Sequence, residues 1–371
     1  MTEPLGVAVI GTGSIANAHL YTYQHSERAR LAAVVDVDKA RAKDAAQRFE
    51  AQRVYTDYHE ALADGDVQAV SICTPPFLHV EMTVAALVAG KHVLCEKPVA
   101  PALAGLDAIA AAEAASSASF SGVFQLRYGR GAQGVRRLLD EGAFGRLHMG
   151  IAETLWFRDH DYYDVPWRGT WEQECGGVTV SQAIHLIDSL VWFLGEPVSV
   201  YAQAGTFRTR TEIDDTTVAV IRFANGAIGQ VTSTVSAFGP ERARLEIYGT
   251  DLTALSQGSQ YDATSELFAL GAPVQPSAEA LAARMEAEVP ATSRMLHRPA
   301  IEDFLAAIAE GRRPTIGVDE CRTALQVTTA IYKSAMSGEV VTLPIAPDDP
   351  FYTALPPAGM ALPAVRDTEA L

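Results

Sequence analysis

A glycine-rich turn near the start of the chain is the first group of residues with a recognisable chemistry. Residues 11–16 read Gly-Thr-Gly-Ser-Ile-Ala and follow the short apolar run 6–10. The first glycine permits a tight turn, the second lets backbone approach a pyrophosphate, and Ala16 permits close packing of a helix on a strand. Because a helix N-terminus offers free N–H groups to phosphates, the turn predicts a dinucleotide site. The expected cofactor contacts are Gly11, Gly13, Ser14 and Ile15.

An aspartate ends the second apolar run, at the distance from the glycines where a ribose is usually bound. Asp36 closes residues 31–36, and a carboxylate there can accept hydrogen bonds from the adenosine ribose hydroxyls. The same charge would repel a 2′-phosphate, which favours NAD over NADP. Arg41 nearby keeps NADP possible. The alternative is that Asp36 is a solvated loop residue with no role in cofactor binding.

Two further segments end apolar runs and carry groups suited to catalysis. Residues 73–76 read Cys-Thr-Pro-Pro, and residues 96–98 read Glu-Lys-Pro. In open α/β sheets ligands bind at the carboxyl ends of the strands, so both segments are expected at the cofactor. Lys97 could donate to the oxygen of a substrate carbinol or carbonyl. For His79 a role at the start of the following helix competes with cofactor contact. The cofactor residues expected here are Thr74, Pro75, His79, Glu96, Lys97 and Pro98.

A second candidate group lies in the segment 175–188, where two glycines precede a helical pattern. Apolar residues recur at helical spacing, and Ser181, His185 and Asp188 fall on a neighbouring face at i, i+4 and i+7. A histidine that titrates near neutrality suits removal of a hydroxyl proton. From the residues alone, a histidine satisfied within the core is the commoner case for His185.

Aromatic and cationic residues just upstream suit a polyol. An aromatic ring stacks on C–H faces, while a guanidinium binds hydroxyls or a carboxylate. Packing is the expected role of Trp171. The candidate substrate residues, including those at the site's other segments, are Lys97, Gln125, Arg127, Tyr163, Trp167, Arg168, Ser181, Gln182 and His185.

The elements that must position these groups follow from hydrophobic patterning. Over the first 120 or so residues, short apolar runs alternate with helical stretches, which predicts a parallel sheet covered by helices on both faces. Beyond residue 122, longer alternating strands predict an antiparallel or mixed sheet, with a hairpin at Asn225-Gly226. Helical patterning resumes at 299–310 and 319–336. The expected domains are 1–122 (dinucleotide binding), 123–344 (substrate binding and oligomerisation) and a Pro/Ala-rich tail, 345–371, that either lies on the surface or is mobile.

Composition narrows the class of protein. The chain has 371 residues and a net charge of −16, so nucleic acid and anionic membranes are not expected partners. No run of about 18 apolar residues and no signal-like N-terminus is present, which favours a cytoplasmic protein. The four cysteines are scattered, and neither they nor the histidines show metal-ligand spacing, so no metal site is expected.

Taken together, these motifs resemble the Gfo/Idh/MocA oxidoreductases. The resemblance rests on GxGxxA, on Thr-Pro-Pro-x-x-His, on residues 89–98 (AGKHVLCEKP) and on Gly-Gly followed by a helical histidine. It implies a Rossmann domain, a C-terminal α/β domain with a large open, mostly antiparallel sheet, and hydride transfer to or from a sugar or cyclitol carbon. It also implies that Lys97 and His185 are catalytic and that Glu96 and Pro98 shape the cofactor site. The family's usual aspartate four residues before the histidine is replaced here by Ser181.

The resulting hypothesis is an NAD(P)-dependent dehydrogenase of a sugar, sugar derivative or cyclitol. The expected substrate hydroxyl gives its proton to His185, while Lys97 stabilises the developing oxyanion. Two alternatives stay open, namely a glycosidase or lyase cycle through transient oxidation, and a non-catalytic regulator that senses dinucleotide. A homodimer or homotetramer is expected, because strands such as 216–223 carry apolar or small residues on both faces.

Overall fold

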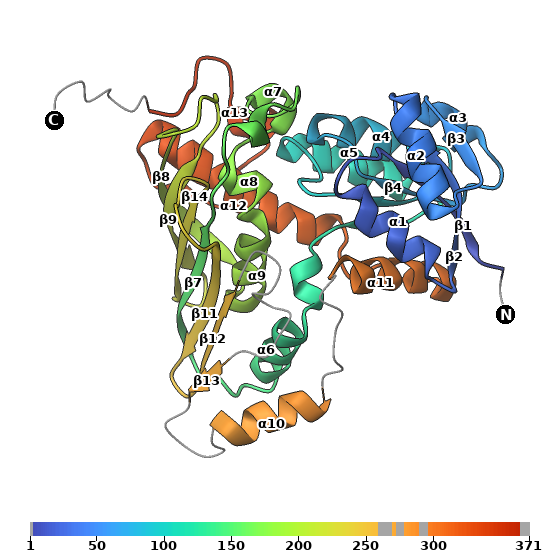
Figure 1. Ribbon diagram of the computed structural model, residues 1–371. Coiled ribbons are helices and arrows are strands. Elements are labelled where there is room, and N and C mark those ends of the chain that lie inside the picture. Colours follow the sequence, from blue (N-terminus) through green and yellow to red (C-terminus); the bar gives the residue numbers. More distant parts are fainter. Residues whose placement is uncertain (1–2, 259–268, 272–277, 289–295, 364–371) are drawn as a thin grey trace. The chain divides into compact units, whose positions relative to one another are not determined.

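A computed structural model of the protein describes residues 3–258, 269–271, 278–288 and 296–363 (Figure 1). The chain forms two compact units. The first contains Met1–Gln125 and His297–Arg322, and the second contains Leu126–Leu296 and Thr323–Leu371. The first unit therefore takes back a segment from late in the chain, which local sequence patterns do not reveal.

The first unit is built on a parallel six-stranded sheet with the order β3-β2-β1-β4-β5-β6, the order of a dinucleotide-binding Rossmann fold. Its central strands are buried on both faces, as their continuous apolar runs predict. The strands are β1 (Leu5–Ile10), β2 (Ala29–Val35), β3 (Arg53–Tyr55), β4 (Ala69–Ile72), β5 (His92–Cys95) and β6 (Phe120–Gly122). The helices are α1 (Ala16–Gln24), α2 (Lys39–Phe49), α3 (Tyr58–Ala63), the 3₁₀ turn η1 (Pro76–Leu78), α4 (His79–Val88), α5 (Leu103–Ala114) and α11 (His297–Glu310).

The second unit is built on an eight-stranded sheet with the order β13-β12-β11-β7-β10-β9-β8-β14. Its pairs are antiparallel except β7 with β10, which is parallel, so the prediction of an open, mostly antiparallel sheet is confirmed. The strands are β7 (Leu147–Leu155), β8 (Pro197–Gly205), β9 (Thr216–Phe223), β10 (Ile228–Thr234), β11 (Arg242–Gly249), β12 (Thr253–Gly258), β13 (Ala269–Gly271) and β14 (Val341–Thr342).

The remaining helical elements complete the second unit and its links to the first. They are η2 (Gln125–Tyr128), α6 (Arg130–Asp140), η3 (Asp161–Tyr163), α7 (Trp171–Glu174), α8 (Val178–Ser181), α9 (Ile184–Leu194), α10 (Ala278–Glu288), α12 (Val318–Ser337) and α13 (Pro350–Thr353). Among the described residues no single helix is long and apolar enough to cross a membrane. One bent pair, Trp171–Ser181 with Ile184–Leu194, passes by length and composition only.

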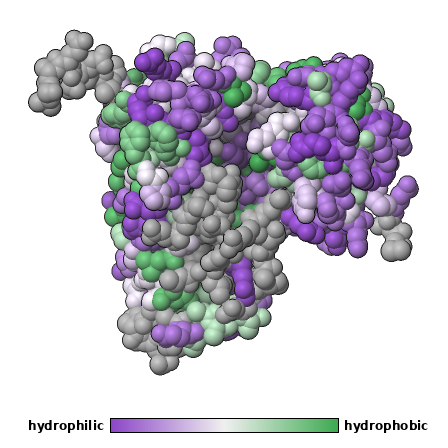
Figure 2. Space-filling view, viewed as in Figure 1, coloured by the Kyte–Doolittle hydropathy of each residue, from purple (hydrophilic) through white to green (hydrophobic). Residues whose placement is uncertain are grey.

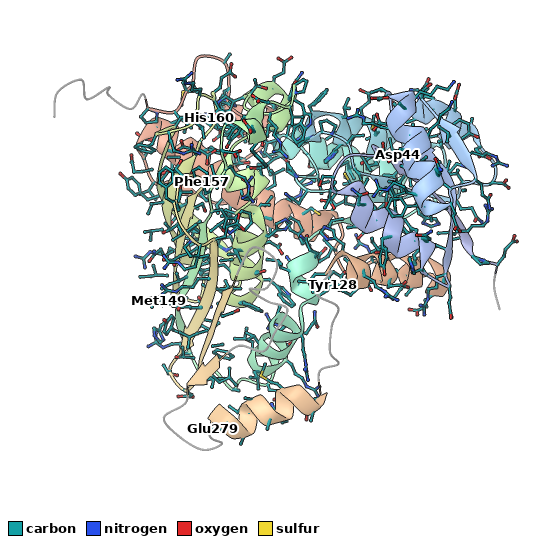
Figure 3. All side chains as sticks on the ribbon, in the orientation of Figure 1. Asp44, Tyr128, Met149, Phe157, His160 and Glu279 are labelled. Atoms are coloured by element: carbon teal, nitrogen blue, oxygen red, sulfur yellow. The ribbon has the colours of Figure 1, made fainter. Side chains whose placement is uncertain are left out.

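One face of the second sheet packs on helices and the other is exposed. Val200, Ala202 and Ile221 are buried, and the Ser334 hydroxyl on α12 accepts from the Ala202 N–H. On the opposite face five apolar side chains are 36–49% exposed, and we call this set the outer face: Met149, Tyr201, Val218, Val220 and Ile228. Figure 2 shows apolar residues, in green, over the strands of this sheet, and Figure 3 labels Met149 on β7.

The Asn-Gly hairpin is confirmed. β9 and β10 pair antiparallel, and Gly226 has φ +88°, a conformation that favours glycine. The Asn225 side chain accepts from the Ala227 N–H at 3.0 Å, so the two turn residues fix the register locally.

The expectation that Ser181, His185 and Asp188 lie on one continuous helix is wrong. α8 ends at Ser181 and α9 begins at Ile184, with a bend of 54° between them. The Ala183 N–H donates to Val178 O, five residues back, at 2.8 Å. This extra residue in the turn breaks the i, i+4 relation between Ser181 and His185, so the shared helical face does not form.

The late segments are only partly described. Between residues 253 and 296 the structure describes β12, β13 and α10, and the ranges 259–268, 272–277 and 289–295 lie outside the described residues. In the tail, Ile345 and Phe351 are buried, and Lys333 pairs with Asp349. The tail is therefore packed at least as far as α13, while residues 364–371 lie outside the described residues.

Candidate active site

The glycine-rich turn is shaped to hold a dinucleotide. Gly11 has φ +87°, and a Cβ there would lie 2.8 Å from Cys73 O, so no other residue fits without strain. A Cβ on Gly13 would meet nothing within 4 Å, and Gly13 and Ser14 are exposed. α1 begins directly afterwards, and no side chain caps its N-terminus at Ile15. Its N–H groups thus face an open approach suited to a pyrophosphate.

Asp36 is held rigidly at the end of β2. Its Oδ2 accepts from the Thr12 N–H at 2.9 Å and the Thr12 hydroxyl at 2.8 Å. Its Oδ1 accepts from the Asp38 N–H at 2.9 Å and from Arg41 Nη2 at 3.0 Å. Burial would raise the pKa of Asp36, but these donors lower it below its usual value. The carboxylate is therefore ionised, and its four acceptor positions are occupied.

A ribose diol can reach Asp36 only by displacing one of these donors, and Arg41 is the most accessible, with its side chain 58% exposed. We expect Asp36→Ser to shift the ratio of NADP to NAD affinity by at least about tenfold, because it removes a repulsive charge and frees Arg41 to bind a 2′-phosphate. Titrating protein fluorescence with NADH and NADPH measures the ratio. The double variant Asp36→Ser/Arg41→Ala should lose most of the gain, and tighter NADP binding by the natural protein would contradict the prediction.

His79 joins the two loops at the carboxyl ends of β4 and β5. Its Nδ1 lies 2.7 Å from Pro98 O and its Nε2 lies 2.8 Å from Thr74 O. The residue is 1% exposed. Thr74, Pro75 and Lys97 are half-buried at this edge. With both ring nitrogens directed at backbone carbonyls, His79 can influence a cofactor through the positions of these loops.

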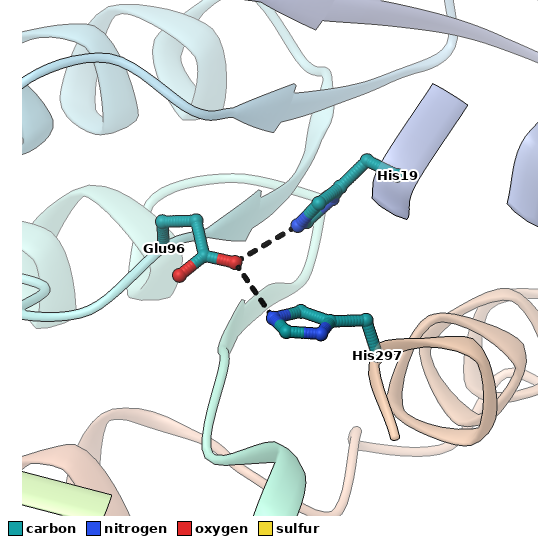
Figure 4. Close-up of side chains that lie close together, drawn as sticks. All are labelled: His19, Glu96 and His297. Atoms are coloured by element: carbon teal, nitrogen blue, oxygen red, sulfur yellow. Dashed lines mark hydrogen bonds and ion pairs between the residues drawn. The ribbon is translucent and has the colours of Figure 1, made fainter. Parts of the chain in front are cut away.

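Glu96 is buried under the loop that carries Lys97. Its Oε1 lies 2.9 Å from His19 Nε2 and 3.5 Å from His297 Nε2 (Figure 4). Its Oε2 accepts from the Lys97 N–H at 3.2 Å. Burial would raise the pKa of Glu96, but the hydrogen bonds from the two histidines hold it well below its usual range. A buried carboxylate therefore anchors the main chain of Lys97.

The hydrogen bonds around Glu96 have a definite direction. A carboxylate only accepts, so His19 Nε2 carries the proton and His19 Nδ1 accepts from the Ser71 hydroxyl at 3.1 Å. The Ser71 oxygen lies 2.6 Å from the Tyr23 hydroxyl, which can then donate to it. Burial lowers the pKa of His19, which favours this neutral tautomer. This series of hydrogen bonds runs from Tyr23 through Ser71 and His19 to Glu96.

Sequence reasoning missed His19 and His297, because residues so far apart show no common spacing. With Glu96 they present three atoms of metal-ligand type within 4.8 Å of one another, among the residues that the structure describes. Their mutual hydrogen bonds already account for this geometry. The expectation of no metal site stays a prediction.

In the second unit, Ser181 is bound to its own segment. Its hydroxyl donates to Gly177 O at 2.7 Å and also contacts Gln182 Oε1. His185 is half-buried in the first turn of α9. The broken helix removes the reason for expecting Ser181 to act directly on His185, and their roles stay predictions.

Arg168 lies at the centre of a polar and aromatic cluster. Its Nη1 lies 2.8 Å from Glu174 Oε1 and 2.5 Å from the Tyr162 hydroxyl. Its guanidinium carbon lies 3.9 Å from the centre of the Tyr162 ring and 4.2 Å from that of Trp167. Tyr162 also accepts from Gln182 Nε2 at 2.8 Å. The structure thus joins the predicted residues Arg168 and Gln182 through Tyr162, which the sequence did not single out, while Trp167 contacts Arg168 directly.

Glu174 is the second residue of this cluster that sequence reasoning missed. It is 2% exposed, and its Oε2 accepts from the Gly169 N–H at 2.7 Å. Burial raises the pKa of Glu174, and Arg168 opposes the shift. Tyr163 lies beside the cluster, edge-on to Tyr162 with ring centres 5.1 Å apart.

Arg127 forms a two-pronged ion pair with Asp188. Nε and Nη2 donate to the two carboxylate oxygens at 2.8 and 2.6 Å, and the side chains are 9% and 2% exposed. The guanidinium also lies over the Trp192 ring. The substrate role expected of Arg127 therefore competes with a structural one. Gln125, at the end of the first unit, is buried.

Comparison with known proteins identifies the family. The protein-family model described as "Oxidoreductase family, NAD-binding Rossmann fold" matches residues 5–122 of the sequence. The family model described as "GFO/IDH/MocA C-terminal domain" matches residues 132–254. Myo-inositol 2-dehydrogenase of Thermotoga maritima is 29% identical over 250 residues, covering 66% of this chain and 72% of that protein. Levoglucosan dehydrogenase of Pseudarthrobacter phenanthrenivorans is 27% identical over 285 residues, covering 67% and 72%.

A solved structure extends the likeness to most of the chain. The WlbA dehydrogenase from Bordetella pertussis, in complex with NADH and UDP-GlcNAcA, matches with a TM-score of 0.83 and 27% identity, covering 93% of this chain and 99% of that one. The strand order of the first sheet and the open glycine turn are those expected of the family that both models match. The chain belongs to the Gfo/Idh/MocA family of oxidoreductases and binds NAD on its N-terminal Rossmann fold.

Proposed function

We propose that the protein is an NAD-dependent dehydrogenase that oxidises a carbinol, or reduces the matching carbonyl, of a sugar, sugar derivative or cyclitol. The observation that carries the proposal is the loop at the carboxyl end of β5, where buried Glu96 anchors the main chain of Lys97. The aromatic and guanidinium cluster around Arg168 supports a polyol substrate. Relatives named as inositol and levoglucosan dehydrogenases support the same substrate class.

In the oxidising direction, the substrate hydroxyl gives its proton to His185. Lys97 donates to the same oxygen and stabilises the negative charge that develops on it. When bound, NAD supplies the nicotinamide that accepts the hydride. Glu96 and His79 act indirectly, because they hold the backbone on either side of Lys97. The hydride carries both electrons removed from the carbinol, the proton passes to His185, and the carbonyl compound remains as the product.

The test is a panel of polyols and sugars supplied with NAD or NADP and followed by the absorbance of the reduced cofactor. Steady cofactor reduction by at least one polyol supports the proposal. Substrate cleavage without net NADH would indicate a cycle through transient oxidation. Cofactor binding without turnover of any member would contradict catalysis and favour a sensor of dinucleotide.

We also propose that a second copy of the chain covers the outer face. Tyr201 lies opposite Val220 across β8 and β9, and Ile228 lies opposite Met149 across β10 and β7. Exposed apolar side chains in adjacent rows favour association, and a symmetric pair is the commonest arrangement.

The oligomer is tested by replacing Val220, which is 49% exposed, with lysine. The natural protein is expected to have at least twice the mass of one chain in light scattering at micromolar concentration. Val220→Lys should lower that mass, because association would bury an unpaired charge. Val88 is 77% exposed at the end of α4, and Val88→Lys should leave the mass unchanged. A monomeric natural protein would contradict the proposal.

A further inference from the structure

The charges in the cluster around Arg168 bear on whether the substrate is charged or neutral. The Arg168 side chain is 19% exposed and that of its partner Glu174 is 2% exposed, so the carboxylate is fixed inside the protein while the arginine side chain stays partly accessible. A buried carboxylate at 2.8 Å offsets the positive charge that Arg168 would otherwise present.

The positive charge of Arg127, the other arginine expected to bind substrate, is also offset by a carboxylate. Arg127 uses both prongs of its guanidinium on Asp188, and both side chains are almost fully buried. Thus each of the two cationic candidates in the second unit is matched by a buried carboxylate of its own. This pairing is not visible in the sequence.

The two aromatic side chains that contact the Arg168 guanidinium, Tyr162 and Trp167, are uncharged. A further arginine, Arg158, lies 5.5 Å from the centre of the Tyr162 ring, and it too is paired with a carboxylate, that of Glu241. Tyr162 and Gln182 supply a hydroxyl and an amide, linked at 2.8 Å, and Trp167 supplies an aromatic ring that packs on the Arg168 guanidinium. Such groups bind hydroxyls and the C–H faces of a polyol. Lys97, the cation of the first unit's loop, is assigned in the proposed mechanism to the oxygen that reacts.

We infer that the substrate is an uncharged polyol, sugar or cyclitol rather than a uronate or sugar phosphate. The inference rests on the proposed function and names the substrate class of that same site. A carboxylate or phosphate beside Arg168 would meet a cation whose charge is already offset, and it would be repelled by Glu174. Like charges brought together at a desolvated site reduce affinity strongly.

The first test compares substrates that differ only in charge, such as a hexose with its uronate and a cyclitol with its phosphate. We expect kcat/KM for the neutral member to exceed that for the anion by at least about tenfold. Equal or faster turnover of the anion would overturn the inference. If neither member of any pair is turned over, the proposed function fails. Calorimetric titration of the NADH-loaded protein with the same pairs then decides the inference by affinity alone.

The second test alters the offsetting charge. Glu174→Gln removes the negative charge and nearly preserves the side chain's shape, so Arg168 becomes a net cation. The ratio of kcat/KM for anion to neutral substrate should rise at least about tenfold. Glu172→Gln is the matched control, since Glu172 lies on the same helix but is exposed, and it should leave the ratio unchanged.

A double variant tests whether a change in the ratio of kcat/KM comes from the charge of Arg168 or from disturbed folding. Arg168→Gln/Glu174→Gln removes both charges, so its ratio should stay near that of the natural protein even if turnover falls. Circular dichroism and a cooperative unfolding transition verify that each variant is folded, because Arg168 and Glu174 lie in the second unit, whose folding NADH binding to the Rossmann unit does not report. An unchanged ratio in a folded Glu174→Gln variant would show that Glu174 does not set the charge preference and would overturn the inference.

Discussion

Replacing Lys97 with alanine is expected to lower kcat by about 10²–10³-fold, the usual effect of removing one donor from a developing oxyanion. NAD affinity should change little. The variant keeps the main-chain N–H that Glu96 binds, so the loop retains its anchor while the ammonium group is lost. Steady-state kinetics on the best substrate of the panel, together with NADH titration, measure the two effects separately.

Two variants serve as controls for this result. Lys39→Ala removes an exposed lysine at the start of α2, and it should leave kcat unchanged. Lys97→Arg keeps a positive charge and should retain more activity than alanine, although the planar guanidinium fits the position of an ammonium poorly. Near-normal turnover in Lys97→Ala would show that Lys97 is structural and that the proposed mechanism is wrong.

Replacing Asp188 with alanine is expected to lower the free energy of unfolding by about 3–5 kcal/mol, the usual cost of breaking a buried ion pair by removing one partner. The reason is that Arg127, whose side chain is 9% exposed, loses the partner of both its prongs. Urea denaturation followed by circular dichroism measures the loss.

The cost arises from the unpaired charge, and two variants test this. Arg127→Met/Asp188→Leu removes both charges and should recover most of the lost stability, because apolar packing often replaces a buried ion pair without loss. Asp140→Ala breaks a pair with Arg136 in which Asp140 is 64% exposed, and it should cost less than about 1 kcal/mol. Equal losses for Asp188→Ala and Asp140→Ala would contradict the interpretation.

The parallel sheet could be predicted because its signals are local. The four longer strands of the first unit are continuous apolar runs, which is the pattern of strands buried on both faces. β3 and β6 were not predicted, since each has three residues, which is too few to display a pattern. The Asn-Gly hairpin could also be predicted, because its two central residues alone select the turn type.

Features that depend on distant contacts could not be predicted. The break at Gln182 and Ala183 lies inside a segment whose apolar spacing is helical throughout. The parallel pairing of β7 with β10 joins strands separated by β8 and β9 in the sequence. The return of α11 to the first unit brings His297 to Glu96, a contact that no local pattern encodes.

The sequence by itself determined the Rossmann sheet and a glycine turn fit for a dinucleotide. It also led to the prediction that a lysine and a histidine act in hydride transfer. Such features depend on residue types at short spacing, so a linear pattern is enough. Only the tertiary structure decided the electrostatic state of these groups. Glu174 and Asp188 offset the charges of Arg168 and Arg127, and His19 and His297 hold Glu96 ionised. The charge that a side chain presents depends on its burial and on the partner that folding brings within about 3 Å, and neither is written in local spacing.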